Sequence, residues 1–185
     1  MHSTTATSFA RRTTATVLLL SLSACSSGPT SPSDPLPRPE SDIPFISYVS
    51  EPGEFVGGGE SRLITNTFIH AVHRSQDAEG REYVFVTAKV DGSQSLWGLL
   101  FASAVGRKLE RGVYEHASMA PRPDEPKLRF DANDRGCSAN SGRFEIKEAV
   151  YGSAGTVKRL HATFEQRCAT VTAALHGEVR IVAPQ

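Results

Sequence analysis

The sequence has little of the features that mark several large classes of protein. Its 20 Lys and Arg residues equal its 20 Asp and Glu residues, so it has no surplus of positive charge for nucleic-acid phosphates, and we expect no nucleic-acid partner. After residue 25 no apolar run approaches the ~20 residues that a transmembrane helix needs. The chain has only three cysteines, Cys25, Cys137 and Cys168, and an odd number in a secreted protein suggests that one has a separate role.

Motifs for catalysis and metal binding are equally scarce. The chain has no G-x-S-x-G nucleophile elbow, no H-E-x-x-H helix and no glycine loop placed to hold a phosphate. His70 and His73 are three residues apart, which on a strand sends their side chains to opposite faces. We therefore expect a protein that is not an enzyme and that needs neither a cofactor nor a metal ion.

The segment DANDRG, residues 131–136, is similar to the beginning of a calcium-binding loop. Arg135 stands where an EF-hand has an oxygen ligand, and Gly142 stands where it has a Glu, so the full motif fails. Two interpretations stay open, a looser calcium site and an ordinary polar turn. The candidate ligands of the looser site are Asp131, Asn133 and Asp134.

What the sequence does contain begins with an export signal in residues 1–24. Arg11 and Arg12 precede an apolar stretch of about a dozen residues, which is too short to cross a bilayer, and small residues follow it. Residues 22–25, Leu-Ser-Ala-Cys, resemble the lipobox of bacterial prolipoproteins. The resemblance implies cleavage before Cys25 and its acylation, with palmitate as one typical chain, which gives a durable membrane anchor. The alternative is an ordinary signal peptide with an incidental cysteine.

Residues 25–44 look like a tether rather than part of a fold. Residues 26–44 hold six of the eleven prolines and five serines, a composition that favours an extended spacer. Loss of residues 1–24 removes two of the 20 basic residues and leaves a net charge of −2. We expect an exported protein, anchored to a bacterial cell membrane or outer membrane, whose domain faces the periplasm or the exterior.

Residues 45–185 contain thirteen of the fourteen aromatic residues and are expected to form one domain. Short alternating segments separated by Gly, Asp, Ser and Pro predict strands, and no helical period is sustained. The fold class expected is all-β, an antiparallel sandwich or jelly roll of about nine strands. The expected strands are residues 45–50, 62–73, 82–90, 95–103, 108–116, 127–130, 143–151, 157–167 and 174–182.

The first of two hairpins that can be read in detail turns at residues 91–94, where Gly-Ser suits a type II′ turn. Pairing Val90 with Ser95 places Val84, Val86 and Ala88 opposite Phe101, Leu99 and Trp97. The other face carries Tyr83, Phe85, Leu96 and Leu100, so both faces are apolar. Such a hairpin is most often covered on both faces, and less often has one face exposed for binding.

The second hairpin turns at residues 152–155. A register that pairs Phe144 with Phe164 sets Ile146 opposite Ala162 and Lys147 opposite His161 on the solvent side. Glu148 would then share a face with the two apolar residues as a partly buried carboxylate. The favoured alternative is an edge position or an ion pair with Lys158 or Arg159. Cys168 lies just beyond the open end, within reach of Cys137. In an exported protein the two are expected to form a disulfide.

Several segments of residues 47–182 together resemble an uncharacterised extracellular all-β domain of secreted and lipid-anchored bacterial proteins. The central match is a two-cysteine pattern, Arg135-Gly136-Cys137 followed by Phe164-Glu165-Gln166 and Cys168. The other matching residues are 141–144, 148–151, Ala174, Leu175 and Gly177, with Pro52, Gly53, Gly57, Gly59, Trp97, Gly112 and Tyr114 upstream. The resemblance implies a β module with no known activity and therefore no catalytic residue.

Three functions are compatible with these observations. The first is a non-catalytic binding or structural module of the cell envelope, with the membrane as one partner through its anchor and an envelope protein or glycan as another. The second is a carrier of a small apolar ligand in a barrel-like interior lined by Tyr83, Phe85, Trp97 and Leu100. The third, an envelope hydrolase, lacks any catalytic constellation.

Overall fold

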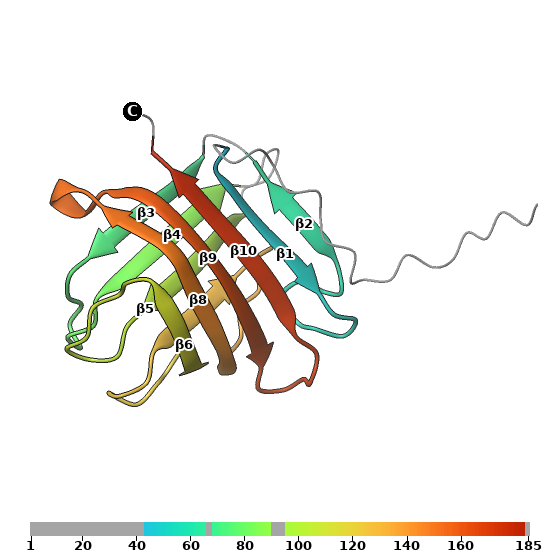
Figure 1. Ribbon diagram of the computed structural model, residues 1–185. Coiled ribbons are helices and arrows are strands. Elements are labelled where there is room, and N and C mark those ends of the chain that lie inside the picture. Colours follow the sequence, from blue (N-terminus) through green and yellow to red (C-terminus); the bar gives the residue numbers. More distant parts are fainter. Residues whose placement is uncertain (1–42, 66–67, 90–94, 184–185) are drawn as a thin grey trace, which may run out of the picture. The chain divides into compact units, whose positions relative to one another are not determined.

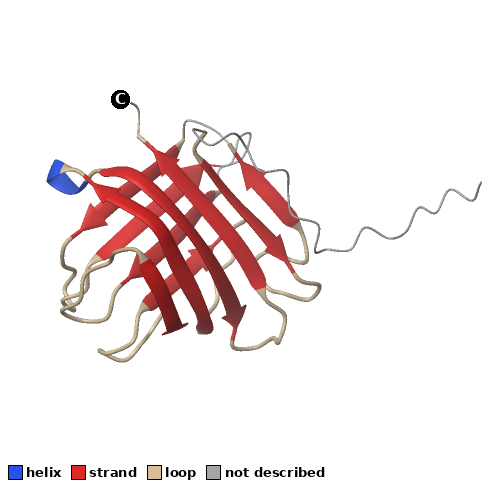
Figure 2. Cartoon of the chain, in the orientation of Figure 1, coloured by secondary structure: helices blue, strands red, loops and turns tan. Residues whose placement is uncertain are grey.

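The computed structural model describes residues 43–65, 68–89 and 95–183, all within one compact unit. The expected signal segment, Cys25 and most of the tether lie outside the described residues, as does the turn expected at 91–94. The fold is all-β, as the sequence predicts, with two antiparallel sheets consistent with a sandwich (Figures 1 and 2). The strands are β1 (Phe45–Ser50), β2 (Ser61–Ile64), β3 (Ile69–Arg74), β4 (Tyr83–Lys89), β5 (Leu96–Ala102), β6 (Gly112–Ala117), β7 (Lys127–Asp131), β8 (Asn140–Tyr151), β9 (Val157–Cys168) and β10 (Leu175–Val182), with a 3₁₀ turn, η1, at Ser153–Gly155.

The large sheet has six strands in the order β2-β1-β10-β9-β8-β6, and the small sheet has four in the order β3-β4-β5-β7. Figure 1 looks onto the large sheet, with the small sheet behind it. The sheets approach each other at two corners. At one, β3 bridges to the end of η1 through Val72 and Thr156, and at the other Ser118 bridges to Lys127 at the start of β7.

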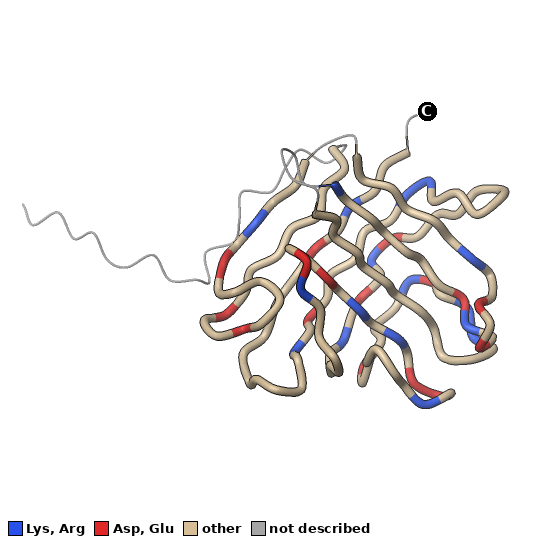
Figure 3. Tube along the Cα trace, turned by 180° about the vertical axis from the view of Figure 1, so that it is seen from behind, with Lys and Arg blue, Asp and Glu red and all other residues tan. Residues whose placement is uncertain are grey.

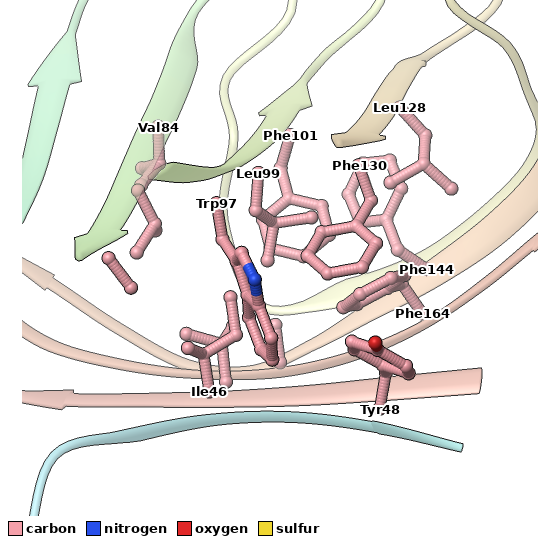
Figure 4. Close-up of a cluster of buried hydrophobic side chains, with 14 of the residues drawn as sticks. Ile46, Tyr48, Val84, Trp97, Leu99, Phe101, Leu128, Phe130, Phe144 and Phe164 are labelled. Carbon is pink, nitrogen blue, oxygen red and sulfur yellow. The ribbon is translucent and has the colours of Figure 1, made fainter. Parts of the chain in front are cut away.

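The space between the sheets is filled by side chains from both. Trp97 and Phe101 of the small sheet meet Tyr48 and Phe144 of the large sheet, and all four are buried (Figure 4). The rings meet at angles, for example Tyr48 and Trp97 at 5.0 Å between centroids, an arrangement that aromatic quadrupoles favour. Among the described residues, the core runs from Ile46 to Ile181 and draws on both sheets, so residues 45–183 are expected to fold as one domain.

The expected strand at residues 62–73 is wrong as a single element. The structure divides it into β2 and β3, which belong to different sheets, so the fold has ten strands among its described residues instead of nine. The strand expected at 108–116 is also shorter than predicted, because residues 108–111 precede β6 as loop. Leu109 is nevertheless buried in the core, and its backbone N–H donates to Glu82 Oε2 at 3.0 Å.

The register of the first hairpin is confirmed, but the expectation that both of its faces are covered is wrong. Val84, Val86 and Ala88 pair with Phe101, Leu99 and Trp97, and all six are fully buried. The opposite face is only partly covered: Phe85 is 41% exposed and Leu96 is 58% exposed. The small sheet therefore covers the core on one side and presents an apolar face on the other.

The register of the second hairpin is confirmed only up to Ile146. Phe144 pairs with Phe164 and Ile146 with Ala162, but a bulge at Lys147 then sets Glu148 opposite His161. The pairing of Lys147 with His161 is therefore wrong. Because a bulge inserts one residue, Glu148 moves to the face opposite Phe144 and Ile146. There it forms the ion pair with Arg159 that was the favoured alternative, at 2.6 Å.

Candidate functional site

The two cysteines of the domain form the disulfide that the second hairpin predicts. Cys137 follows β7, Cys168 ends β9, and their Cα atoms are 5.2 Å apart. Both residues are buried within the core. The bridge therefore links the loop after β7 of the small sheet to the end of β9, an inner strand of the large sheet.

Gln166, two residues before Cys168 in the two-cysteine pattern, joins the two sheets. Its side-chain amide donates to the carbonyl of Phe130 at 2.9 Å and accepts the N–H of Phe130 at 2.9 Å. Asn140 beside it donates both to Gln166 Oε1 at 2.7 Å and to the carbonyl of Leu128 at 3.0 Å. Phe130 and Leu128 lie on β7, the edge strand of the small sheet, so two buried amides replace the neighbouring strand that this edge lacks.

Glu54 has a similar structural role in the glycine-rich loop between β1 and β2. This carboxylate is 2% exposed and accepts the backbone N–H groups of Val56 and Gly57 at 2.9 and 2.6 Å, together with the hydroxyl of Ser50 at 2.9 Å. A Cβ at Gly57 would lie 2.4 Å from the Cβ of Ser50, so only glycine fits there. Gly57 and Gln166, two residues of the pattern that the sequence singled out, are thus explained by packing and hydrogen bonding.

The segment at residues 131–136 forms a tight turn. Ala132 and Arg135 exchange both backbone hydrogen bonds, and the two residues between them have positive φ, 53° at Asn133 and 59° at Asp134. The Asn133 amide is occupied by the core: its oxygen accepts Trp97 Nε1–H at 3.4 Å and its nitrogen donates to the Tyr48 hydroxyl at 3.0 Å.

No group of three or more His, Cys, Asp or Glu side chains is placed to hold a metal ion within residues 43–65, 68–89 and 95–183. In the same part of the chain, no helix is long and apolar enough to span a membrane.

The four residues expected to line an apolar interior lie on two opposite faces of the small sheet. Trp97 points into the core and is fully buried. Tyr83, Phe85 and Leu100 lie on the outer face, because they alternate with the buried residues of the same strands. The barrel-like interior lined by all four residues is therefore not formed, and the space between the sheets is occupied by the core.

The outer small-sheet face is the most distinctive surface of the described domain. We use this name for the outward residues of β3, β4, β5 and β7 together with Phe68, which directly precedes β3. Its apolar members are Phe68, Val72, Tyr83, Phe85, Leu96 and Leu100. Its charged members are Arg74, Lys89, Lys127, Arg129 and Asp131, so four are basic and one is acidic. Figure 3 views the molecule from the side opposite to Figure 1 and marks the charged positions along the chain.

The outer face of the large sheet has a different character, since it carries several ion pairs between acidic and basic side chains and fewer large apolar ones. Arg143 meets Glu115 at 3.0 Å, and Glu148 meets Arg159 at 2.6 Å. Hydrogen bonding to the Arg159 guanidinium holds the pKa of the Glu148 carboxyl below its usual value. His161 contacts Glu178 at 2.8 Å. This face is typical of a solvated sheet surface.

One cluster of polar side chains was not expected from the sequence. His73 points inward, opposite to His70 as predicted, and its Nε2 lies 2.6 Å from Glu82 Oε1. The His73 ring stacks on Tyr151 at 3.8 Å between centroids, and the Tyr151 hydroxyl donates to the carbonyl of Leu109 at 2.9 Å. Burial raises the pKa of Tyr151 above its ordinary value. Because Glu82 also accepts the backbone N–H of Leu109, this cluster links the loop before β6 to the small sheet by hydrogen bonds.

Arg81 is a second buried polar group that only the structure identifies. It is 1% exposed and donates to the backbone carbonyls of Ser103, Glu125 and Arg122 at 3.0, 2.6 and 2.8 Å. Its Nε also pairs with Glu79 at 3.1 Å. These groups come from three separate loops, so a single side chain holds that end of the domain together.

The described residues thus provide two surfaces of contrasting character and several buried polar clusters whose contacts are structural. No protein family, curated protein or solved structure matches this chain.

Proposed function

We propose that the protein is an exported, lipid-anchored module of the bacterial cell envelope whose role is binding or structural and not catalytic. The observation that carries the proposal is the buried Cys137–Cys168 disulfide. Disulfides of this kind persist in oxidising compartments outside the cytoplasm, which supports export by the signal-like segment. Because this bridge uses both cysteines of the domain, Cys25 is left for acylation within the lipobox-like sequence.

The filled core favours this proposal over the carrier of a small apolar ligand. Trp97, Phe101 and Phe130 occupy the space between the sheets and are fully buried. A carrier needs an internal cavity, so contact with a partner is expected to take place on the outer surface.

The experiment that tests the anchor compares wild type with Cys25→Ala in a bacterial host supplied with labelled palmitate. A neighbouring variant, Ser26→Ala, is the matched control, because it changes the same segment and leaves the thiol. We expect label and membrane association in wild type and Ser26→Ala, and neither in Cys25→Ala. Membrane-bound, labelled Cys25→Ala protein would contradict the proposal.

A further inference from the structure

The outer small-sheet face is apolar along a continuous row. Val72, Phe85 and Leu100 lie directly opposite one another on β3, β4 and β5. The Phe85 ring rests over Gly98, where an added Cβ would be only 3.6 Å from the ring. Leu96 is 58% exposed and Phe68 is 56% exposed, and both lie toward one end of the sheet, four residues along the chain from Leu100 and Val72. Exposed apolar surface of this extent on one face is typical of an interaction surface.

Basic side chains outnumber acidic ones around this row. Arg74 and Lys89 flank the apolar residues on β3 and β4, and Arg129 on β7 lies directly opposite Leu100. Lys127 also lies on this face and contacts Glu79 at 3.6 Å, while Asp131 pairs with Arg129, so the four basic groups exceed these two acidic ones. The surface therefore favours an occupant that offers apolar contact together with negative charge.

These requirements decide between the possible occupants. A second copy of the same face would bring one excess of basic over acidic side chains against another, which is unfavourable. A bilayer that contains anionic lipids offers negative headgroups directly above an apolar layer, and exposed Phe and Leu side chains partition into that boundary while Lys and Arg contact the headgroups. The side chains of the row project from one face of a sheet, so they can contact the surface of a bilayer together.

We infer that the outer small-sheet face docks onto the anionic surface of a lipid bilayer. The inference rests on the proposed function, because the anchor would keep the domain beside a membrane. Residues 26–44 are the tether, and at ~3.1 Å per residue they extend to at most about 60 Å. Within that radius the effective concentration of the bilayer is high, so a weak contact suffices to hold the face against it. Tether and face then act as two attachments of one domain.

The test uses residues 26–185, which lack the acylation site and retain the tether and the whole core. Sedimentation is measured with vesicles of phosphatidylcholine alone and with vesicles that also contain phosphatidylglycerol. We expect binding to the anionic vesicles, weaker binding to the neutral ones, and a decrease as salt is raised, because surface charges are screened. Equal binding to both vesicles, or binding to neither, would overturn the inference.

Matched variants assign the contact to this face. We expect Phe85→Ser with Leu96→Ser to lower the binding constant by roughly tenfold or more, because partly exposed apolar area is no longer buried. Val113→Ser, a 54% exposed residue of β6, is the apolar control and should leave binding unchanged. For the charges, Arg74→Glu is compared with Arg143→Glu on the large sheet, and only the former should weaken binding.

Circular dichroism establishes that each variant is folded before its binding is measured. Equal losses in the face variants and their controls would overturn the inference. Analytical ultracentrifugation without vesicles tests whether a second copy of the chain occupies the face. If wild type is a dimer and the Phe85→Ser, Leu96→Ser variant is a monomer, the face is a dimer interface, and the inference is overturned. Because the tested chain lacks Cys25, these results are independent of whether acylation occurs.

Discussion

The junction between the sheets at Gln166 leads to a quantitative prediction. Replacing Gln166 with Leu keeps similar bulk in a position that is 1% exposed, but removes both hydrogen-bonding groups of the amide. The N–H and the carbonyl of Phe130 and one N–H of Asn140 then lose their partner. Each buried polar group left unsatisfied costs about 1–3 kcal/mol. Since costs within one network are not additive, we expect a total loss of about 3–5 kcal/mol.

The assay is equilibrium unfolding in urea with the disulfide intact. Thr163→Leu is the matched control, because Thr163 lies on the same strand and points to the opposite face. We expect the control to change the free energy of unfolding by less than about 0.5 kcal/mol, as most surface substitutions do. If Gln166→Leu were as stable as this control, the amide would not be joining the sheets, and the reasoning would be refuted.

Three further predictions concern other buried groups. Arg81→Met should lower the free energy of unfolding by about 3–5 kcal/mol, because three backbone carbonyls lose their donor. Arg122→Met, which changes a side chain that is 79% exposed, is the control and should leave that free energy unchanged when both are measured by urea unfolding. Replacing Cys137 and Cys168 together by Ala should cost about 3–4 kcal/mol in the chain-entropy account of a loop of this length, and a melting temperature equal to that of wild type would contradict it. Burial raises the pKa of Tyr151, so its contribution to stability is fully present below the ordinary pKa of 10.0 and is lost as pH rises above it. Absorbance should show that Tyr151 ionises at higher pH in the folded protein than in the unfolded chain. Identical titration curves for the two states would refute this.

Local patterns predicted the hairpins well because the relevant contacts are between neighbours in sequence. Alternation in β4 and β5 was enough to pair Val86 with Leu99, and the pairing of Phe144 with Phe164 brought the cysteines within reach of each other. The same alternation showed that both faces of the first hairpin are apolar. It could not show which face would be covered, because that depends on where the large sheet packs.

The failures have a common physical cause, namely contacts between distant parts of the chain. Residues 62–73 have a continuous strand-forming composition, yet β2 pairs with β1 in the large sheet and β3 with β4 in the small one. The bulge at Lys147 contains no glycine that would have predicted it from the sequence. It places Glu148 on the opposite face from the one expected. Arg81 and Gln166 appear in the sequence as ordinary polar residues of strand-rich segments. Their partners are 22 to 44 residues away, so only the folded chain identifies their roles.

Several residues of the pattern that the sequence singled out have structural roles. Gln166 makes hydrogen bonds, Gly57 allows close packing, and Gly177 leaves space for the Phe164 ring, which would lie 2.1 Å from an added Cβ. In this structure these three residues support the scaffold. The surface proposed to contact a membrane is instead formed by residues such as Phe85 and Leu96, which lie outside that pattern.

The most direct test of the account is the intact mass of the protein extracted from membranes of an expressing bacterium. The account predicts a chain that begins at Cys25, carries acyl groups on that residue, and is two hydrogens lighter than the reduced form because of the Cys137–Cys168 bridge. An unmodified chain, or one cleaved elsewhere with a free thiol at Cys25, would contradict it.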